Sequence, residues 1–298
     1  MFELLLITKK KTVSYSPGLG LFSGDYGSTY LSSTSKYTYS IDSISTGASL
    51  TQALSGRAAS GNEQKGVFAG GAGSHPYVYT ACDNYMYGSD AVATYAYLST
   101  KRTQHAAIGN ATIGVFACGT DKNVNFKTTE KYQWDTNVVT DSSLMSSARY
   151  YLSGFGNSTF GIFAGGYNGL STAEKYTYSN ESITPAAALA TARLYASACA
   201  NADFGLFVGG SYSKDTIEKR FFSTDSVSFT TSLIQPRYYS GATGNALIGL
   251  IIGGRSGTPY VLSSEKYEYA KDTISVGTAL TSNRINISAT SSTPGWSV

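Results

Sequence analysis

The chain of 298 residues carries 22 basic and 19 acidic side chains, and its net charge is +3. So small an excess of positive charge argues against nucleic acid or a membrane surface as the partner. Charged residues make up 14% of the sequence, against about 25% in an average soluble protein, and serine, threonine, glycine, asparagine and 24 tyrosines take their place. A surface of hydroxyl, amide and phenol groups is typical of extracellular proteins and virions.

The N-terminal segment begins with a short apolar run, residues 4–7, and the basic residues 9–11 follow it. A secretory signal has its basic residues first and a longer apolar run, so we predict no signal peptide. No apolar stretch approaches the length of about 20 residues that spans a bilayer, and we expect no membrane insertion. Residues 2–8 are instead predicted to form a strand, with Lys9 standing where later segments carry arginine.

A Gly-x-Phe-x-Gly-Gly motif, or a close variant of it, recurs along the rest of the chain. Its copies begin at Gly20, Gly66, Gly114, Gly161, Gly205 and Gly249. The copies are nearly evenly spaced, with a period of about 45 residues that indicates small supersecondary units stacked on one another. Each copy is nearly all apolar, which predicts a strand buried on both faces.

Three further segments follow each copy in a fixed order. The first alternates aromatic and polar residues after a Glu-Lys dipeptide, as in residues 174–178, and this alternation puts both rings on one face of a strand. In the second repeat this strand is either residues 85–87 or residues 95–97. The second segment ends in a leucine or methionine four residues before an arginine, as Leu189 precedes Arg193. The third begins at that arginine and closes with Gly-Asn, a hairpin-turn signal.

Each repeat therefore contains four short strands and shows no helical periodicity. Four strands in a unit of this length predict an all-β fold, a β-propeller of four-stranded antiparallel blades. The glycine pair would end the second strand, where a positive φ is needed.

The repeat resembles the kelch repeat, which carries a diglycine, a spaced Tyr and Trp, and a following Arg. Gly165-Gly166, Tyr176 and Arg193 stand at these places. The chain departs from the kelch pattern in lacking the Trp of most copies and in carrying Ser23-Gly24 and Cys118-Gly119 instead of two glycines. The resemblance implies a single kelch-like β-propeller domain over residues 1–298, and it transfers fold rather than function.

The two ends of the chain bear on the number of blades. Arg284 precedes Gly295 by the same interval that separates Lys9 from Gly20, and residues 295–298 look like the start of another Gly-x-Phe strand. We therefore expect seven blades, with the seventh made from both termini. A six-bladed ring with overhanging ends is the alternative, and either closure joins the ends and removes free sheet edges.

Arginines recur at equivalent positions of the repeats, at Arg102, Arg149, Arg193, Arg237 and Arg284, with Arg57 offset. They would either form a ring of cations around one mouth of the channel, able to bind an acidic glycan or peptide, or bind backbone carbonyls and the repeated glutamates. Repetition in every blade is typical of scaffolding, so we favour the structural role.

No set of residues predicts catalysis or metal binding. The two histidines, His75 and His105, belong to different repeats, and the three cysteines show no spacing that predicts disulfides or a metal site. We expect the cysteines to be buried small residues, and we expect no cofactor and no enzymatic activity. A carbohydrate-active or oxidase enzyme on a propeller scaffold is a further alternative, because His75, Tyr77 and Cys82 are residue types that a copper oxidase of the galactose-oxidase kind uses.

The loops after the glycine pairs differ most between repeats, and we expect a binding site where the repeat varies. These loops would share a rim with the connections that lead into the arginine segments. Tyrosine and polar side chains there can stack on sugars and bind their hydroxyls. The candidate binding residues are Tyr26, Tyr30, His75, Tyr77, Tyr167, Asn168, Tyr212, Arg255 and Tyr260.

These features predict a non-enzymatic structural or adhesive propeller that is a tail- or capsid-surface component of a phage virion. Its expected partners are a host surface glycan or neighbouring virion proteins, including further copies of itself as a homo-oligomer. The virion would be assembled in the host cytoplasm. The alternative is a cytoplasmic kelch-type protein-interaction module.

Overall fold

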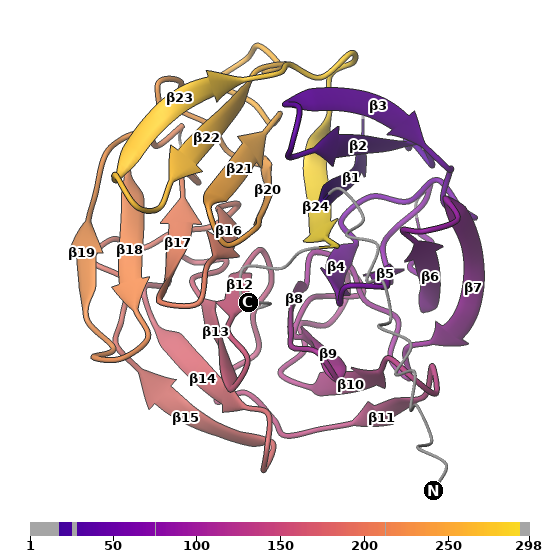
Figure 1. Ribbon diagram of the computed structural model, residues 1–298. Coiled ribbons are helices and arrows are strands. Elements are labelled where there is room, and N and C mark those ends of the chain that lie inside the picture. Colours follow the sequence, from indigo (N-terminus) through magenta and orange to yellow (C-terminus); the bar gives the residue numbers. More distant parts are fainter. Residues whose placement is uncertain (1–17, 26–28, 75, 212, 293–298) are drawn as a thin grey trace, which may run out of the picture.

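The computed structural model describes residues 18–25, 29–74, 76–211 and 213–292. Within these ranges the chain forms six four-stranded antiparallel sheets around a central axis, as the blades of a β-propeller (Figure 1). The predicted fold class is confirmed, but the number of blades is six, the predicted alternative, and the expected number of seven is wrong. No helix in the described ranges is long and apolar enough to cross a membrane.

Each blade contributes its innermost strand to the wall of the channel, and the Gly-x-Phe strand lies next to it. In the order of blades 1 to 6, the innermost strands are β24 (Ile285–Ser291), β4 (Ala58–Gly61), β8 (Ala106–Gly109), β12 (Ser153–Gly156), β16 (Ser197–Ala200) and β20 (Gly241–Gly244). The second strands are β1 (Leu19–Asp25), β5 (Lys65–Ala69), β9 (Ile113–Ala117), β13 (Phe160–Ala164), β17 (Phe204–Val208) and β21 (Ile248–Ile252).

The two outer positions of each blade hold the aromatic strand and the edge strand. The third strands are β2 (Thr34–Thr38), β6 (Ala81–Met86), β10 (Thr129–Gln133), β14 (Ala173–Thr177), β18 (Ile217–Phe221) and β22 (Ser264–Glu268). The edge strands are β3 (Ser43–Gly47), β7 (Ala91–Tyr97), β11 (Val139–Asp141), β15 (Ser182–Ala186), β19 (Val227–Phe229) and β23 (Thr273–Gly277). In the second repeat, Tyr85 lies in the aromatic strand and Tyr95 and Tyr97 lie on the edge.

Blade 1 closes the ring with strands from both ends of the chain (Figure 1). Its innermost strand, β24, pairs antiparallel with β1, and Ala289 lies opposite Phe22. The Leu19 N–H donates to Ser292 Oγ over 2.8 Å, and the Ser292 N–H donates to the Leu19 carbonyl, also over 2.8 Å. The predicted junction of the two ends is therefore confirmed.

The expectation of seven blades fails because the segment after Arg284 is the inner strand of blade 1. This segment completes the sheet of the Gly20 copy, so it leaves no inner strand over for a seventh sheet. The partial copies at residues 2–8 and 295–298, on which that expectation was based, lie outside the described residues.

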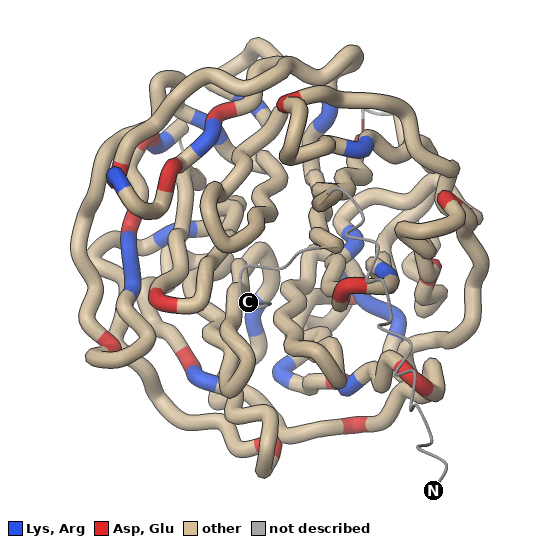
Figure 2. Tube along the Cα trace, viewed as in Figure 1, with Lys and Arg blue, Asp and Glu red and all other residues tan. Residues whose placement is uncertain are grey.

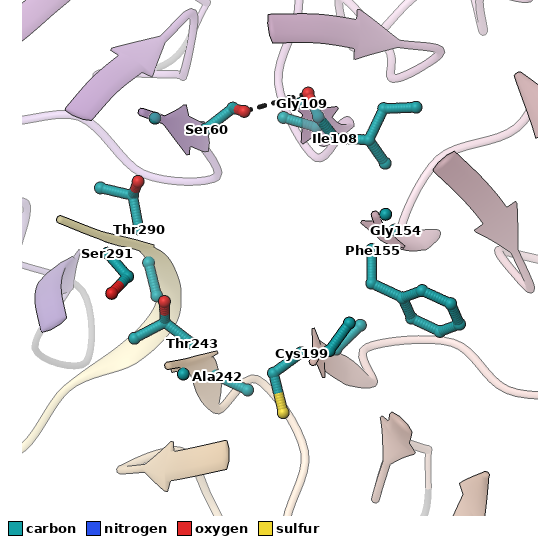
Figure 3. Close-up of a pocket in the computed structure, with 17 residues that line it drawn as sticks. Ser60, Ile108, Gly109, Gly154, Phe155, Cys199, Ala242, Thr243, Thr290 and Ser291 are labelled. Carbon is teal, nitrogen blue, oxygen red and sulfur yellow. Dashed lines mark hydrogen bonds between the residues drawn. The ribbon is translucent and has the colours of Figure 1, made fainter. Parts of the chain in front are cut away.

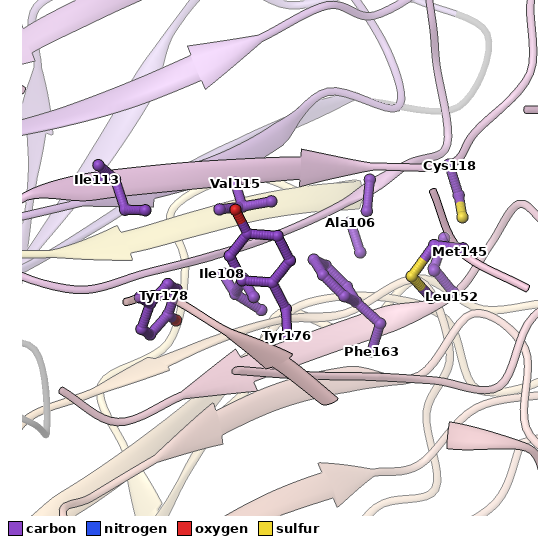
Figure 4. Packing of buried hydrophobic residues seen from close by; sticks show 11 residues of the cluster. Ala106, Ile108, Ile113, Val115, Cys118, Met145, Leu152, Phe163, Tyr176 and Tyr178 are labelled. Carbon is purple, nitrogen blue, oxygen red and sulfur yellow. The ribbon is translucent and has the colours of Figure 1, made fainter. Parts of the chain in front are cut away.

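Buried apolar clusters fill the interfaces between neighbouring blades throughout the described part of the chain. Between blades 3 and 4, Val115 of β9 packs with Phe163 and Tyr176 of blade 4 (Figure 4). Phe163 faces blade 3, whereas its neighbour Ile162 packs with Phe207 of blade 5. The Gly-x-Phe strand is thus buried on both faces, as predicted, and each such side chain contributes about 1.5–3 kcal/mol of burial free energy.

The repeated arginines lie inside the protein and do not surround the channel mouth as free cations. Arg193 is 1% exposed, its Nε donates to Glu218 Oε1 over 2.8 Å, and its Nη1 donates to the Gly209 carbonyl. Glu218 also accepts the backbone N–H groups of Ala190 and Thr191. The structural role is confirmed for this pair, and the same acid–base contact recurs as Arg57–Asp83, Arg102–Glu130, Arg149–Glu174 and Arg237–Glu265.

The glycine pairs end the second strands with left-handed backbone, as predicted. Gly165 has a φ of 74° and Gly166 a φ of 122°. A Cβ atom on Gly165 would lie 2.4 Å from the carbonyl oxygen of Arg193, so the close approach of the next blade excludes any side chain. The role of these glycines in the fold is architectural.

Candidate functional site

One face of the ring carries the glycine loops and the connections into the innermost strands. The two kinds of segment pair through their backbones in blades 4 and 6. The Tyr167 N–H donates to the Tyr150 carbonyl over 2.8 Å, and the Arg255 N–H donates to the Tyr238 carbonyl over 2.9 Å. The predicted shared rim of loops and connections is confirmed.

A collar of left-handed residues narrows the channel mouth on this face. Their φ angles lie between 48° and 61°, and the collar residues are Gly56, Gln104, Tyr151, Tyr195, Tyr239 and Asn286. Neighbouring members are joined by backbone hydrogen bonds: the Tyr151 N–H donates to the Gln104 carbonyl over 2.8 Å, and the Tyr239 N–H donates to the Tyr195 carbonyl over 3.1 Å. The collar residues line a space of about 90 Å³ at the mouth.

Tyrosine occupies this left-handed position in blades 4, 5 and 6. The φ angles are 58° at Tyr151, 58° at Tyr195 and 57° at Tyr239. A bulky side chain rarely adopts this conformation, whereas Gly56 and Asn286 are of the types that favour it. Strained backbone of this kind, which costs about 1–3 kcal/mol per residue, clusters at functional sites. We take the three tyrosines as evidence that aromatic rings are needed at this side of the mouth.

The collar tyrosines belong to a larger tyrosine cluster, which consists of Tyr150, Tyr151, Tyr167, Tyr195, Tyr238 and Tyr239. The ring centroids of Tyr151 and Tyr195 are 4.1 Å apart, as are those of Tyr195 and Tyr239. Burial raises the pKa of Tyr151, with a further contribution from Tyr195, and burial followed by a hydrogen bond with Tyr195 raises the pKa of Tyr239. The phenols of Tyr151 and Tyr239 therefore stay uncharged at physiological pH and act as neutral donors and acceptors.

Outward from the collar, the cluster continues into a hollow of about 1010 Å³ over blades 4, 5 and 6, which we call the tyrosine hollow. Aromatic rings from three blades line it, with Tyr167 from blade 4, Tyr195 from blade 5 and Tyr238 from blade 6. Polar groups share the lining with the rings, and the lining residues are Tyr167, Asn168, Gly169, Ala192, Leu194, Tyr195, Ser211, Ser213, Lys214, Tyr238, Gly257 and Thr258. The hollow thus combines stacking surfaces with hydrogen-bonding groups on a rigid rim.

The structure divides the predicted binding residues between two places. Tyr167 and Asn168 line the tyrosine hollow, and Arg255 and Tyr260 flank the loop that carries Gly257 and Thr258. The Arg255 guanidinium lies 5.2 Å from the ring centre of Tyr260.

The other described candidates, Tyr30 and Tyr77, line a second hollow of about 690 Å³ between blades 1 and 2, together with Tyr79. Tyr77 is 62% exposed. The remaining candidates, Tyr26, His75 and Tyr212, lie outside the described residues.

The sequence analysis missed Tyr195 and Tyr238, although both line the tyrosine hollow. They come from the connections rather than the glycine loops, and connections were expected to be regular. A signal was present for Tyr195, because tyrosine stands two residues after the arginine in three consecutive repeats, at Tyr151, Tyr195 and Tyr239.

The opposite mouth of the channel is lined mostly by small side chains. Ser60, Cys199, Thr243 and Thr290 are among those that surround its open centre, which holds a space of about 110 Å³ (Figure 3). Charged residues of both signs are scattered over the ring (Figure 2). The described lining of this opposite mouth contains no tyrosine, so the tyrosines that line the channel in the described ranges are gathered at the collar.

In the described ranges, His105 and the three cysteines are buried. No group of three or more His, Cys, Asp or Glu residues there is placed to hold a metal ion. His105 packs on Phe116 with ring centres 6.1 Å apart, and burial and the nearby Arg102 lower its pKa well below the usual range. Cys82, Cys118 and Cys199 are buried and unpaired, as predicted.

The fold and this face together define the class of the protein as a six-bladed β-propeller with a tyrosine-lined mouth. No protein-family model matches the chain, and no curated protein is similar to it in sequence.

Proposed function

We propose that this protein is a non-enzymatic, kelch-like β-propeller that binds a carbohydrate through the tyrosine hollow. The proposal rests on one observation: a single hollow of about 1010 Å³ combines phenol rings with amide and hydroxyl groups. A pyranose ring has an apolar face of C–H groups bordered by hydroxyls, so a phenol stacks on the face while polar neighbours bind the rim. The volume lies at the upper end of ligand sites, about 300–1,000 Å³, and suits more than one sugar ring.

The rings of the hollow are held in place by the protein itself. Tyr167 is 45% exposed, and its ring stacks on Tyr150 with centroids 4.7 Å apart and planes at 21°. The Tyr238 hydroxyl donates to the Gly257 carbonyl over 3.1 Å. Fixed rings reduce the entropy lost on binding, which favours affinity for a weakly interacting ligand such as a sugar.

The kelch-like part of the proposal is supported by the positions of three repeated features. The glycine pair ends the second strand, the first tyrosine of the spaced pair lies on the third, and the arginine precedes the innermost strand of the next blade. Gly165, Tyr176 and Arg193 show this arrangement.

Replacing either ring at the opening of the hollow should weaken carbohydrate binding. We expect Tyr167→Ala and Tyr238→Ala each to raise the dissociation constant about tenfold, because each removes a stacking surface. The ligand is selected on a glycan array, and its affinity is then measured by isothermal titration calorimetry. Tyr97→Ala is the matched control, since Tyr97 is 64% exposed on the edge strand β7.

Two results would contradict this assignment. One is an array on which no glycan is retained, and the other is unchanged affinity in both hollow variants. Mass spectrometry of the selected glycan after incubation tests the non-enzymatic part, and we expect the glycan to be recovered intact.

We also propose that the propeller is exposed on the surface of a phage virion. The support is the composition, with 14% charged residues and 24 tyrosines. We expect the protein in purified particles by mass spectrometry, and at the tail or capsid surface by immunogold labelling. Presence in the host lysate together with absence from the particles would favour the cytoplasmic protein-interaction module instead.

A further inference from the structure

The tyrosine hollow carries one formal charge among its described lining residues. That charge is the ammonium of Lys214, and no carboxylate belongs to the described lining. The second hollow, which Tyr30 and Tyr77 line, has no Lys, Arg, Asp or Glu side chain in its described lining. The two hollows are therefore alike in their tyrosines and differ in the presence of a cation.

The Lys214 ammonium is only partly used by the protein. Its Nζ donates to the Ala192 carbonyl over 3.2 Å. An ammonium has three donors, and the described residues accept one of them, which leaves two for a ligand in the hollow. The acidic side chain that acts on the pKa of Lys214 is Glu218, and Glu218 is already bound to Arg193 in the interior.

The protein surroundings of Lys214 disfavour its charge. Burial lowers the pKa of Lys214, the nearby Arg193 lowers it further, and Glu218 opposes the shift. A negatively charged group next to the ammonium would reverse this effect, because an opposite charge within a few ångströms stabilises the charged form.

Resting on the proposed carbohydrate binding, we infer that the ligand of the tyrosine hollow is an acidic saccharide whose carboxylate binds Lys214. The sugar ring stacks between Tyr167 and Tyr238, and Asn168, Ser211 and Ser213 lie within the same hollow for its hydroxyls. A carboxylated ring, such as a uronate or a sialic acid, presents its charge and its apolar C–H face together. The described lining of the hollow between blades 1 and 2 has no ammonium that could select an acidic saccharide in this way.

The test compares acidic sugars with their neutral counterparts. Calorimetry at low ionic strength is run with 3′-sialyllactose against lactose, with trigalacturonate against its methyl ester, and with any acidic glycan retained on the array against its neutral form. We expect the acidic member of a bound pair to bind about tenfold more tightly, as for a hydrogen bond to a charged group. Lys214→Gln should abolish this difference, whereas Lys214→Arg should retain the preference.

Lys271→Gln is the matched control, because it removes a lysine that pairs with Glu268 on the surface, away from the hollow. Equal affinity for acidic and neutral members, or a preference that survives Lys214→Gln, would overturn the inference and leave carbohydrate binding intact. Failure of every saccharide to bind would overturn the proposed function, and the inference with it.

Discussion

Glu218→Ala is expected to lower the free energy of unfolding by about 3–5 kcal/mol, because it leaves the buried charge of Arg193 without its counter-ion. The side chains of both residues are almost fully buried, at 1% exposure for Arg193 and 0% for Glu218. The variant also removes the acceptor for the N–H groups of Ala190 and Thr191, which belong to the connection between blades 4 and 5. The loss therefore combines an unpaired cation with orphaned backbone donors.

The measurement is equilibrium unfolding in urea, followed by tryptophan and tyrosine fluorescence. Glu268→Ala is the matched control, since Glu268 lies on the third strand of blade 6 and pairs with Lys271 at the surface. A surface ion pair contributes about 0–1 kcal/mol, so this variant should unfold nearly as the parent does. Similar losses in the two variants would show that the interior pair does not stabilise the blade in the way argued.

The architecture of a single blade could be predicted from the sequence because its signals are local. The alternation in residues 174–178, the glycine pair at 165–166 and the Gly-Asn turn at 156–157 each specify a strand or a turn within a few residues. The number of blades depends instead on which distant strand pairs with the segment after Arg284. Its pairing with β1 joins segments from opposite ends of the chain, and no local pattern specifies such a partner.

The face that we propose for binding could be predicted only in part, for a related reason. The loop residues Tyr167 and Asn168 were found because they depart from the repeat, but Tyr151, Tyr195 and Tyr239 recur at one position in three consecutive repeats. All six collar positions have a left-handed φ, and tyrosine seldom adopts it. The left-handed φ belongs to the assembled mouth, where backbone hydrogen bonds join neighbouring collar residues.

Ending the chain after Arg284 is expected to open the ring and to destroy the cooperative unfolding of the whole propeller. The deletion removes β24, so β1 loses its inner partner and blade 1 becomes a three-stranded sheet. Ile287 also leaves the cluster that joins blade 1 to blade 6, where it packs with Phe22 and Leu250. Large apolar side chains removed from a core cost about 2–5 kcal/mol each, and the exposed edge of β1 becomes a site for aggregation.

We expect a fall in the melting temperature of more than about 10 °C, given that 1 kcal/mol corresponds to roughly 2–4 °C in a chain of this size. Circular dichroism during a thermal scan measures the fall in melting temperature, and light scattering measures the aggregation at the exposed edge of β1. A chain that ends after Ser292 is the matched control, because it keeps β24 and the described hydrogen bonds between Leu19 and Ser292.

A peptide of residues 285–292 added to the shortened chain should restore much of the lost stability, since strand addition to β1 rebuilds the same backbone pairing. The closure then acts through the strand itself rather than through the covalent link at Arg284. If the shortened chain were destabilised and the peptide had no effect at millimolar concentration, closure would depend on the covalent link at Arg284. If the shortened chain melted at the parent temperature, the stability of the propeller would have to come from the interfaces of blades 2 to 6 alone. Each blade would then be held by its two neighbours without a closed ring, as in an open solenoid.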